Sequence, residues 1–124
     1  MRVLVTGSSG AIGRTVVSGL SSRGHTLRGV DRAEADAELT GLLPLGALVG
    51  DVTDPVVVAS AVSGVDAVVH LAGNPDEATL PEALASHTHT TAALLDAMVD
   101  SGVPRMVYAS SNHAVGLSPR TDRL

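Results

Sequence analysis

The stretch that decides the fold is Arg2-Val3-Leu4-Val5-Thr6-Gly7-Ser8-Ser9-Gly10-Ala11-Ile12-Gly13, residues 2–13 of a chain of 124. A short apolar run stops at Gly7, two more glycines follow at intervals of three, and a helical pattern begins at Ala11. This order predicts a buried strand, a tight turn and the start of a helix. Such a turn points backbone N–H groups and the positive end of a helix dipole at one place, where a phosphate group can bind.

The three glycines each have a different task in a dinucleotide site. Gly7 would allow the sharp turn, Gly10 the close approach of a pyrophosphate to the backbone, and Gly13 the close packing of helix on strand. On the motif alone, glycines that only shape a turn remain the alternative. We interpret the turn as a dinucleotide site in which the cofactor lies against Gly7, Ser9, Gly10, Ala11, Ile12 and Gly13.

An acidic residue strengthens this interpretation. Asp31 ends the second apolar strand pattern, eighteen residues after Gly13. A carboxylate at this place can accept hydrogen bonds from both ribose hydroxyls of NAD, and it would repel a 2′-phosphate. Arg32, the next residue, could instead pair with that phosphate. The sequence therefore favours NAD as the cofactor and leaves NADP as the alternative.

Composition narrows the classes of function. Hydrophobic residues make up 44% and charged residues 17%, which is typical of one globular domain with an aliphatic core, because Tyr108 is the only aromatic residue. The net charge of −5 and the lack of a basic stripe argue against binding to nucleic acid. The absence of cysteine excludes disulfides and thiolate catalysis. No apolar run approaches the ~20 residues of a membrane span, so a cytoplasmic protein is expected.

Strand and helix patterns alternate along the chain. The predicted strands cover residues 2–6, 26–31, 45–50, 66–72 and 105–110. The predicted helices cover residues 11–22, 56–63 and 81–101, and residues 32–43 form a solvated loop or a short helix. This alternation predicts an α/β fold, a Rossmann-type doubly wound parallel sheet of five strands in the order 3-2-1-4-5, with residues 1–124 as one NAD(P)-binding domain.

Two of the predicted helices have apolar side chains that are expected to face the sheet. These are Ile12, Val16, Val17 and Leu20 on the first helix, and Leu84, Leu94, Leu95 and Met98 on the last.

Four motifs occur in an order and spacing that resemble a known superfamily. They are Thr6–Gly13, Asp51-Val52-Thr53-Asp54, His70-Leu71-Ala72-Gly73 and Val107-Tyr108-Ala109-Ser110-Ser111. Together they resemble the extended short-chain dehydrogenase/reductase superfamily, which includes the NAD-dependent sugar epimerases and dehydratases. Residues 109–116, with Asn112 and His113 after Ser111, and residues 121–124 are similar to the uronate dehydrogenases.

The resemblance implies roles for particular residues. Asp51 and Val52 would flank the adenine, and Leu71, Ala72 and Gly73 would line the cofactor where the fourth strand ends.

On the substrate side, the resemblance makes Ser111 the active-site serine, which would hydrogen-bond the substrate oxygen that loses its proton. Asn112 and His113 would help to hold a sugar acid as the small-molecule substrate. Without the resemblance, these three residues would be interpreted as a polar loop after a strand.

The chain departs from the family at the catalytic base. The family uses a tyrosine followed four residues later by a lysine, but this sequence has no lysine, and Tyr108 lies in a predicted strand. The resemblance thus implies that this chain is the amino-terminal half of such a protein and lacks the substrate lobe. Such a half is expected to bind NAD and not to turn over substrate. A non-catalytic NAD(P)-binding sensor and a fragment of an epimerase or dehydratase are the alternatives. Apolar surface left uncovered beside the last strand predicts association, so a homo-oligomer stays open.

The histidines of the predicted elements carry less functional signal. His70 lies in an apolar strand and is expected to be a core residue with satisfied hydrogen bonds. His87 and His89 are two residues apart in a helical segment and do not share a face, so no metal site is predicted. The family usually has asparagine where His87 falls and glycine where Thr90 falls.

Overall fold

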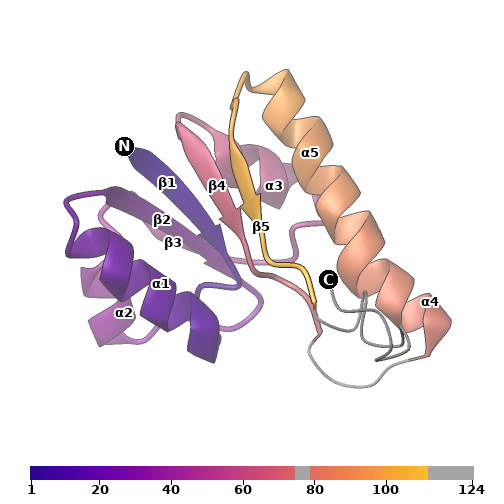
Figure 1. Cartoon of the computed structure of the whole chain (residues 1–124), viewed down its shortest axis with the longest axis horizontal. Helices are drawn as coiled ribbons and strands as arrows, with labels where there is room; N and C mark the ends of the chain where they lie inside the picture. The colour runs from indigo at the N-terminus through magenta and orange to yellow at the C-terminus, as the bar shows by residue number, and fades with distance from the viewer. Residues whose placement is uncertain (75–78, 112–124) are drawn as a thin grey trace, which may run out of the picture.

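A computed structural model describes residues 1–74 and 79–111 of the chain. Its centre is a parallel five-stranded sheet in the order β3-β2-β1-β4-β5 (Figure 1). The strands are β1 (Arg2–Thr6), β2 (Thr26–Asp31), β3 (Ala47–Val49), β4 (Ala67–His70) and β5 (Met106–Tyr108). The predicted Rossmann-type α/β fold and the predicted strand order are both confirmed.

Helices cover both faces of the sheet. In Figure 1, α1 and α2 lie on one side of it and α3 and α5 on the other. The helical segments are α1 (Ala11–Ser21), α2 (Ala37–Gly41), α3 (Pro55–Val62), α4 (Leu80–Ala83), the π-helical segment η1 (Leu84–His89) and α5 (Thr90–Asp100). The short-helix alternative for residues 32–43 is thereby confirmed as α2.

The core consists of two apolar layers separated by the sheet. Side chains alternate between the faces of a strand, so Val3 and Val5 of β1 pack in the layer under α1 and α2. Leu4, between them, packs in the opposite layer with Leu94 of α5. β1 is therefore buried on both faces, and its carboxyl end lies at the lower edge of the sheet in Figure 1.

Capping residues explain where two helices begin. The Asp36 carboxylate accepts a hydrogen bond from the Leu39 backbone N–H at 2.9 Å, which starts α2. The Asp54 carboxylate accepts one from the Val56 N–H at 2.8 Å, and Pro55 follows it as the first residue of α3. α3 therefore begins one residue before the predicted bound at residue 56.

The predicted helix over 81–101 is divided into α4, η1 and α5. The hydroxyl of Thr90, the first residue of α5, donates to the carbonyl of Ala85 in the π-helical segment, five residues earlier, at 3.1 Å. Leu94 and Met98 face the sheet as predicted, but Leu84 and Leu95 are 42% and 43% exposed, so their predicted orientation is wrong. Successive helical residues are about 100° apart, so Leu94 and Leu95 cannot both face the sheet.

The first helix shows a similar correction. Ile12 was expected to face the sheet but is 68% exposed. Gly13 is buried against the Gly7 backbone and takes the contact position, and Ile12, about a quarter turn away, is directed outward.

Three strands are shorter than predicted. β3, β4 and β5 cover residues 47–49, 67–70 and 106–108. Single backbone hydrogen bonds to the neighbouring strands continue beyond these bounds, such as the bond from the Ala109 N–H to the His70 carbonyl at 3.1 Å.

Candidate functional site

The glycine turn has the geometry that its three glycines predict. Gly7 has a φ of +69°, which favours glycine, and a Cβ atom there would lie 3.0 Å from the Ala72 backbone nitrogen. A Cβ atom on Gly13 would lie 2.0 Å from the Gly7 carbonyl oxygen, so helix α1 packs directly on the turn. A Cβ atom on Gly10 would meet only the Gly7 oxygen at 3.4 Å, so the protein leaves the space above Gly10 open.

The N-terminus of α1 faces this open space and has no acidic residue of its own. Gly10 is its N-cap residue and supplies no side-chain acceptor, and the first turn contains no acidic residue. The backbone N–H groups at the start of a helix have no partner within the helix. The first turn, Ala11 to Gly13, therefore offers donors and a positive dipole end to a ligand.

Asp31 joins the turn to the end of β2. Its Oδ2 atom accepts a hydrogen bond from the Ser9 backbone N–H at 2.9 Å, and its Oδ1 atom accepts one from the Ala33 N–H at 3.0 Å. A carboxylate has about four acceptor positions, so about two remain for further donors. The structure thus brings Ser9 and Asp31 together and leaves the carboxylate with acceptor positions for further donors.

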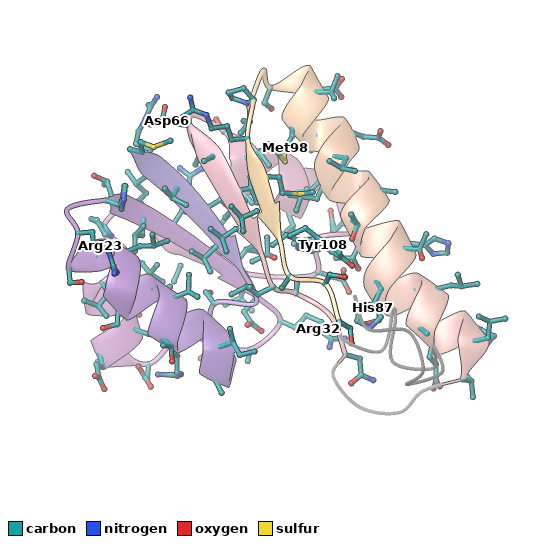
Figure 2. The ribbon with its side chains drawn as sticks, in the orientation of Figure 1. Arg23, Arg32, Asp66, His87, Met98 and Tyr108 are labelled. Atoms are coloured by element: carbon teal, nitrogen blue, oxygen red, sulfur yellow. The ribbon has the colours of Figure 1, made fainter. Side chains whose placement is uncertain are left out.

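Asp51, Val52 and Arg32 lie around the ends of β2 and β3. The Asp51 carboxylate accepts hydrogen bonds from the Thr53 N–H at 2.9 Å and the Thr53 hydroxyl at 2.8 Å. These bonds, and secondarily the charge of Arg32, hold the pKa of Asp51 below its usual value. Val52 is 5% exposed and packs in the apolar layer, while Arg32 is exposed at the carboxyl edge of the sheet (Figure 2).

The segment after β4 is held by Thr6 of β1. The buried Thr6 hydroxyl oxygen accepts hydrogen bonds from the backbone N–H groups of Leu71 at 3.2 Å and Ala72 at 3.1 Å. Since Thr6 immediately precedes Gly7, the glycine turn and the predicted cofactor-lining segment are parts of one hydrogen-bonded structure.

The π-helical segment η1 holds the other end of the same segment. The His87 ring lies against Gly73, where a Cβ atom would come within 2.7 Å of it, and the His87 Nε2 atom is 3.1 Å from the Asn74 carbonyl oxygen. The Asn74 N–H donates to the Ser86 hydroxyl at 2.5 Å. His87, where the family usually has asparagine, is therefore the residue that holds the Gly73–Asn74 backbone in this chain.

His70 is buried next to Thr6, and both of its ring nitrogens are bonded. Nδ1 is 2.7 Å from the Thr6 hydroxyl, and Nε2 is 3.1 Å from the Thr91 hydroxyl of α5. Burial, and then the charge of His87, lowers the pKa of His70 below its usual value. The prediction of a core histidine with satisfied hydrogen bonds is confirmed.

The predicted substrate residues follow β5 at the same edge. The Ala109 N–H donates to the His70 carbonyl at 3.1 Å, and Ser111 lies exposed two residues later. Asn112 and His113 lie outside the described residues. Tyr108 lies in β5 as predicted, with its ring centroid 5.6 Å from that of His70. An open cavity of about 360 Å³ is lined by His87, Thr88, Thr91, Ala92, Leu95 and Tyr108.

The positioning contacts of Thr6, Ser86, His87 and Thr91 at this site are not predicted by the sequence. The signal for Thr6 is a polar residue at the end of an apolar strand, directly before the first glycine. Ser86, His87 and Thr91 have no comparable local signal, because their partners come from β4 and the segment after it.

Two further properties concern the described part of the chain. Within residues 1–74 and 79–111, no group of three or more histidine or acidic side chains is placed to bind a metal ion. Across the same residues, no helix combines the length and the apolar character needed to cross a membrane.

Residues 3–123 match the NAD-dependent epimerase/dehydratase family. The chain belongs to this family. The resemblance to the extended short-chain dehydrogenases is thereby confirmed, and NAD, the cofactor predicted from Asp31, is the cofactor in the family's name.

Curated relatives in this family include two sugar dehydrogenases. The NAD-dependent glucose-6-phosphate dehydrogenase of Haloferax volcanii is 38% identical over 98% of this chain and 47% of its own length. The uronate dehydrogenase of Agrobacterium fabrum is 34% identical over 99% of this chain and 45% of its own length. This chain therefore spans less than half the length of these relatives.

Solved structures of a uronate dehydrogenase also match nearly the whole of this chain. The crystal structure of uronate dehydrogenase from Agrobacterium tumefaciens superimposes with a TM-score of 0.86 and 34% identity over 99% of this chain and 45% of that one. A variant of that enzyme in complex with NAD superimposes equally well.

Proposed function

We propose that this chain is the NAD-binding portion of an oxidoreductase that acts on a sugar or a sugar acid, in the manner of a uronate dehydrogenase. The observation that carries the proposal is the convergence of three features at one edge of the sheet. These features are the open glycine turn before α1, the Asp31 carboxylate and the Leu71–Gly73 segment. In an open parallel sheet, this edge is where ligands bind.

The chain's own residues would hold the cofactor in parts. The backbone N–H groups of Ala11 to Gly13 bind the pyrophosphate, which reaches them over Gly10. The free acceptor positions of Asp31 bind the ribose hydroxyls. Asp51 and the backbone of Val52, whose side chain is buried in the apolar layer, flank the adenine. Bound NAD supplies the acceptor for a hydride from C1 of the substrate.

On the substrate side, Ser111 binds and orients the oxygen from which a proton is lost, and Asn112 and His113 help to hold the sugar acid. The position of Ser111 beyond β5, at the same edge as the glycine turn, supports this assignment. The sugar dehydrogenases among the relatives support a sugar-derived substrate.

The 124 residues are proposed to bind NAD without turning over. The chain has no lysine, and its one tyrosine lies in β5 with its ring beside His70, so the tyrosine–lysine pair of the family is missing. The same absence favours the second candidate function, a non-catalytic NAD(P)-binding sensor. A full-length reading frame that contains Tyr-x-x-x-Lys would favour the first.

A titration of NAD and NADP into the purified chain tests the proposal. NAD is expected to bind more tightly than NADP, and Asp31→Ala is expected to weaken NAD about 10- to 100-fold, because hydrogen bonds to a charged group are lost. Asp100→Ala, at the distant end of α5, is the control and should bind NAD like the unchanged chain.

Two outcomes of this titration would contradict the proposal. The absence of saturable NAD binding, or tighter binding of NADP, would overturn the cofactor assignment. Production of NADH from a hexuronate by the 124 residues alone would overturn the claim that they do not turn over.

A further inference from the structure

The hydrogen bonds at Thr6 have only one consistent direction. A hydroxyl oxygen has two acceptor positions and one hydrogen. The N–H groups of Leu71 and Ala72 can only donate, so they occupy both acceptor positions, with the Leu71 N–H shared between the Thr6 hydroxyl at 3.2 Å and the Thr6 carbonyl oxygen at 3.3 Å. The Thr6 hydrogen must then be donated to its third partner, Nδ1 of His70 at 2.7 Å. Nδ1 of His70 is therefore the acceptor and carries no hydrogen.

The donor-to-acceptor direction of these hydrogen bonds continues from the His70 ring to Thr91 of helix α5. A neutral imidazole with a bare Nδ1 carries its hydrogen on Nε2, which donates to the Thr91 hydroxyl at 3.1 Å. The Thr91 hydroxyl donates its own hydrogen to the His87 carbonyl oxygen at 2.7 Å, and a carbonyl can only accept. Backbone groups at both ends thus fix every donor and acceptor in between.

We propose that Thr6, His70 and Thr91 form a single directed chain of hydrogen bonds that positions the Leu71–Ala72 amides for the dinucleotide. In this directed chain of hydrogen bonds, His70 is a positioning residue held as the neutral Nε2–H tautomer. The part that concerns NAD rests on the proposed function, whereas the directed chain itself does not.

The directed chain returns to the segment from which it starts. It ends on the carbonyl of His87, and the ring of the same residue is bonded to the Asn74 carbonyl and packs on Gly73. Residues 71–74 are therefore held at one end by Thr6 and at the other by His87. A change at Thr91 alters how both ends are held, although none of the interactions described for Thr91 is with residues 71–74.

Protonation of His70 breaks the directed chain. A hydrogen on Nδ1 would face the hydrogen of Thr6, and the Thr6 oxygen could accept a new bond only by releasing Leu71 or Ala72. The titratable side chains placed against His70 in the described residues are His87 on η1 and Tyr108 on β5. Neither is a carboxylate that would stabilise an imidazolium, and burial lowers the pKa of His70, so the neutral ring is favoured at neutral pH.

The tautomer can be measured on the unmodified full chain. The ¹⁵N spectrum of the histidine rings, with the His70 signals identified by their loss in His70→Asn, should show a bare Nδ1 and a protonated Nε2 at neutral pH. An Nδ1–H tautomer or an imidazolium at neutral pH would overturn the proposal. This measurement does not depend on NAD, so its failure is separate from failure of the proposed function.

Substitutions test whether the directed chain positions the amides. Thr91→Val removes one link, and Thr15→Val is the control, because Thr15 makes the same hydroxyl bond to a carbonyl four residues earlier on an exposed part of α1. Thr91→Val should shift the Leu71 and Ala72 amide resonances and weaken NAD about tenfold, as for one neutral hydrogen bond. Thr15→Val should do neither. Equal spectra and equal NAD affinity for the two variants would overturn the proposal.

Two further measurements separate positioning from general loss of structure. The NAD affinity of the unchanged chain should fall at acid pH along the titration curve of His70, and His70→Asn, which keeps an acceptor near the Nδ1 position, should have a flat profile. In a double-mutant cycle, Thr6→Val and Thr91→Val should be less than additive for NAD affinity. Additive effects together with a pH profile unchanged in His70→Asn would overturn the proposal.

Discussion

Gly13 lies so close to Gly7 that a Cβ atom at position 13 would be 2.0 Å from the Gly7 carbonyl oxygen. Backbone rather than a flexible side chain occupies this space, so no rotamer change can relieve the contact. Helix α1 and the turn are therefore positioned against each other by the absence of one methyl group.

Gly13→Ala is expected to destabilise the fold by about 1–3 kcal/mol or more, because helix α1 must move away from the turn. The control is Gly19→Ala in the same helix, where a Cβ atom would meet only the end of the Arg23 side chain at 3.4 Å. That variant should gain about 0.5–1 kcal/mol from helix propensity. Urea denaturation measures both, and equal effects of the two substitutions would contradict the packing argument.

Arg28 is expected to be a structural arginine. Its guanidinium donates to the carbonyls of Leu45 at 3.1 Å and of Ser60, Ala61 and Ser63 at 3.0, 2.9 and 2.7 Å. It thereby caps the last turn of α3 and connects this helix to Leu45, in the segment before β3.

Arg28→Met should cost about 1–3 kcal/mol, since partly buried carbonyls lose their donors. The matched control is Arg23→Met, which removes one exposed bond to the Gly19 carbonyl and should change stability by less than about 0.5 kcal/mol. Thermal unfolding of the two variants checks the difference, and a similar melting temperature for both would refute it.

The stability of the fold should depend on the protonation of His70. Its pKa is lowered in the folded chain, first by burial, so the unfolded chain binds more protons between the folded pKa and the ordinary histidine value of 6.5. The free energy of unfolding should be at its full value above about pH 6.5, fall as the pH drops below it, and level off below the folded pKa.

Urea denaturation from about pH 8 to about pH 5 measures this dependence. His70→Asn should remove the part of the pH dependence of unfolding that His70 contributes. His89→Asn, at an exposed position of η1, should leave that part unchanged. A dependence that persists unchanged in His70→Asn would show that another group is responsible.

The outer face of α5 is expected to promote association of the chain. Leu95 and Val99, one helical turn apart, are 43% and 79% exposed, and Leu95 also lines the cavity beside Tyr108. Light scattering should show association that rises with concentration and falls in the double variant Leu95→Gln/Val99→Gln. Val56→Gln, at a 74% exposed valine of α3, is the control. A monomeric unchanged chain would contradict this expectation.

The fold could be predicted because its signals are local. The apolar run that ends at Gly7, the cap at Asp54 and the strand that ends at Asp31 each act within a few residues, and alternation with right-handed crossovers then leaves one strand order. The inward faces of the helices were less predictable. Leu94 and Leu95 are equally apolar, and only packing against the sheet selects Leu94 for the core.

The sequence by itself determined the glycine turn, its acidic partner Asp31 and the membership of the chain in a family of NAD-dependent enzymes. Only the tertiary structure decided how the cofactor edge is held. Thr6 and His70 are 64 residues apart and meet because β1 and β4 pair in register, and Thr91 reaches His70 from a helix on one face of the sheet. Hydrogen bonds have strict geometry, so contacts of this kind depend on strand register and helix packing, and no local pattern encodes them.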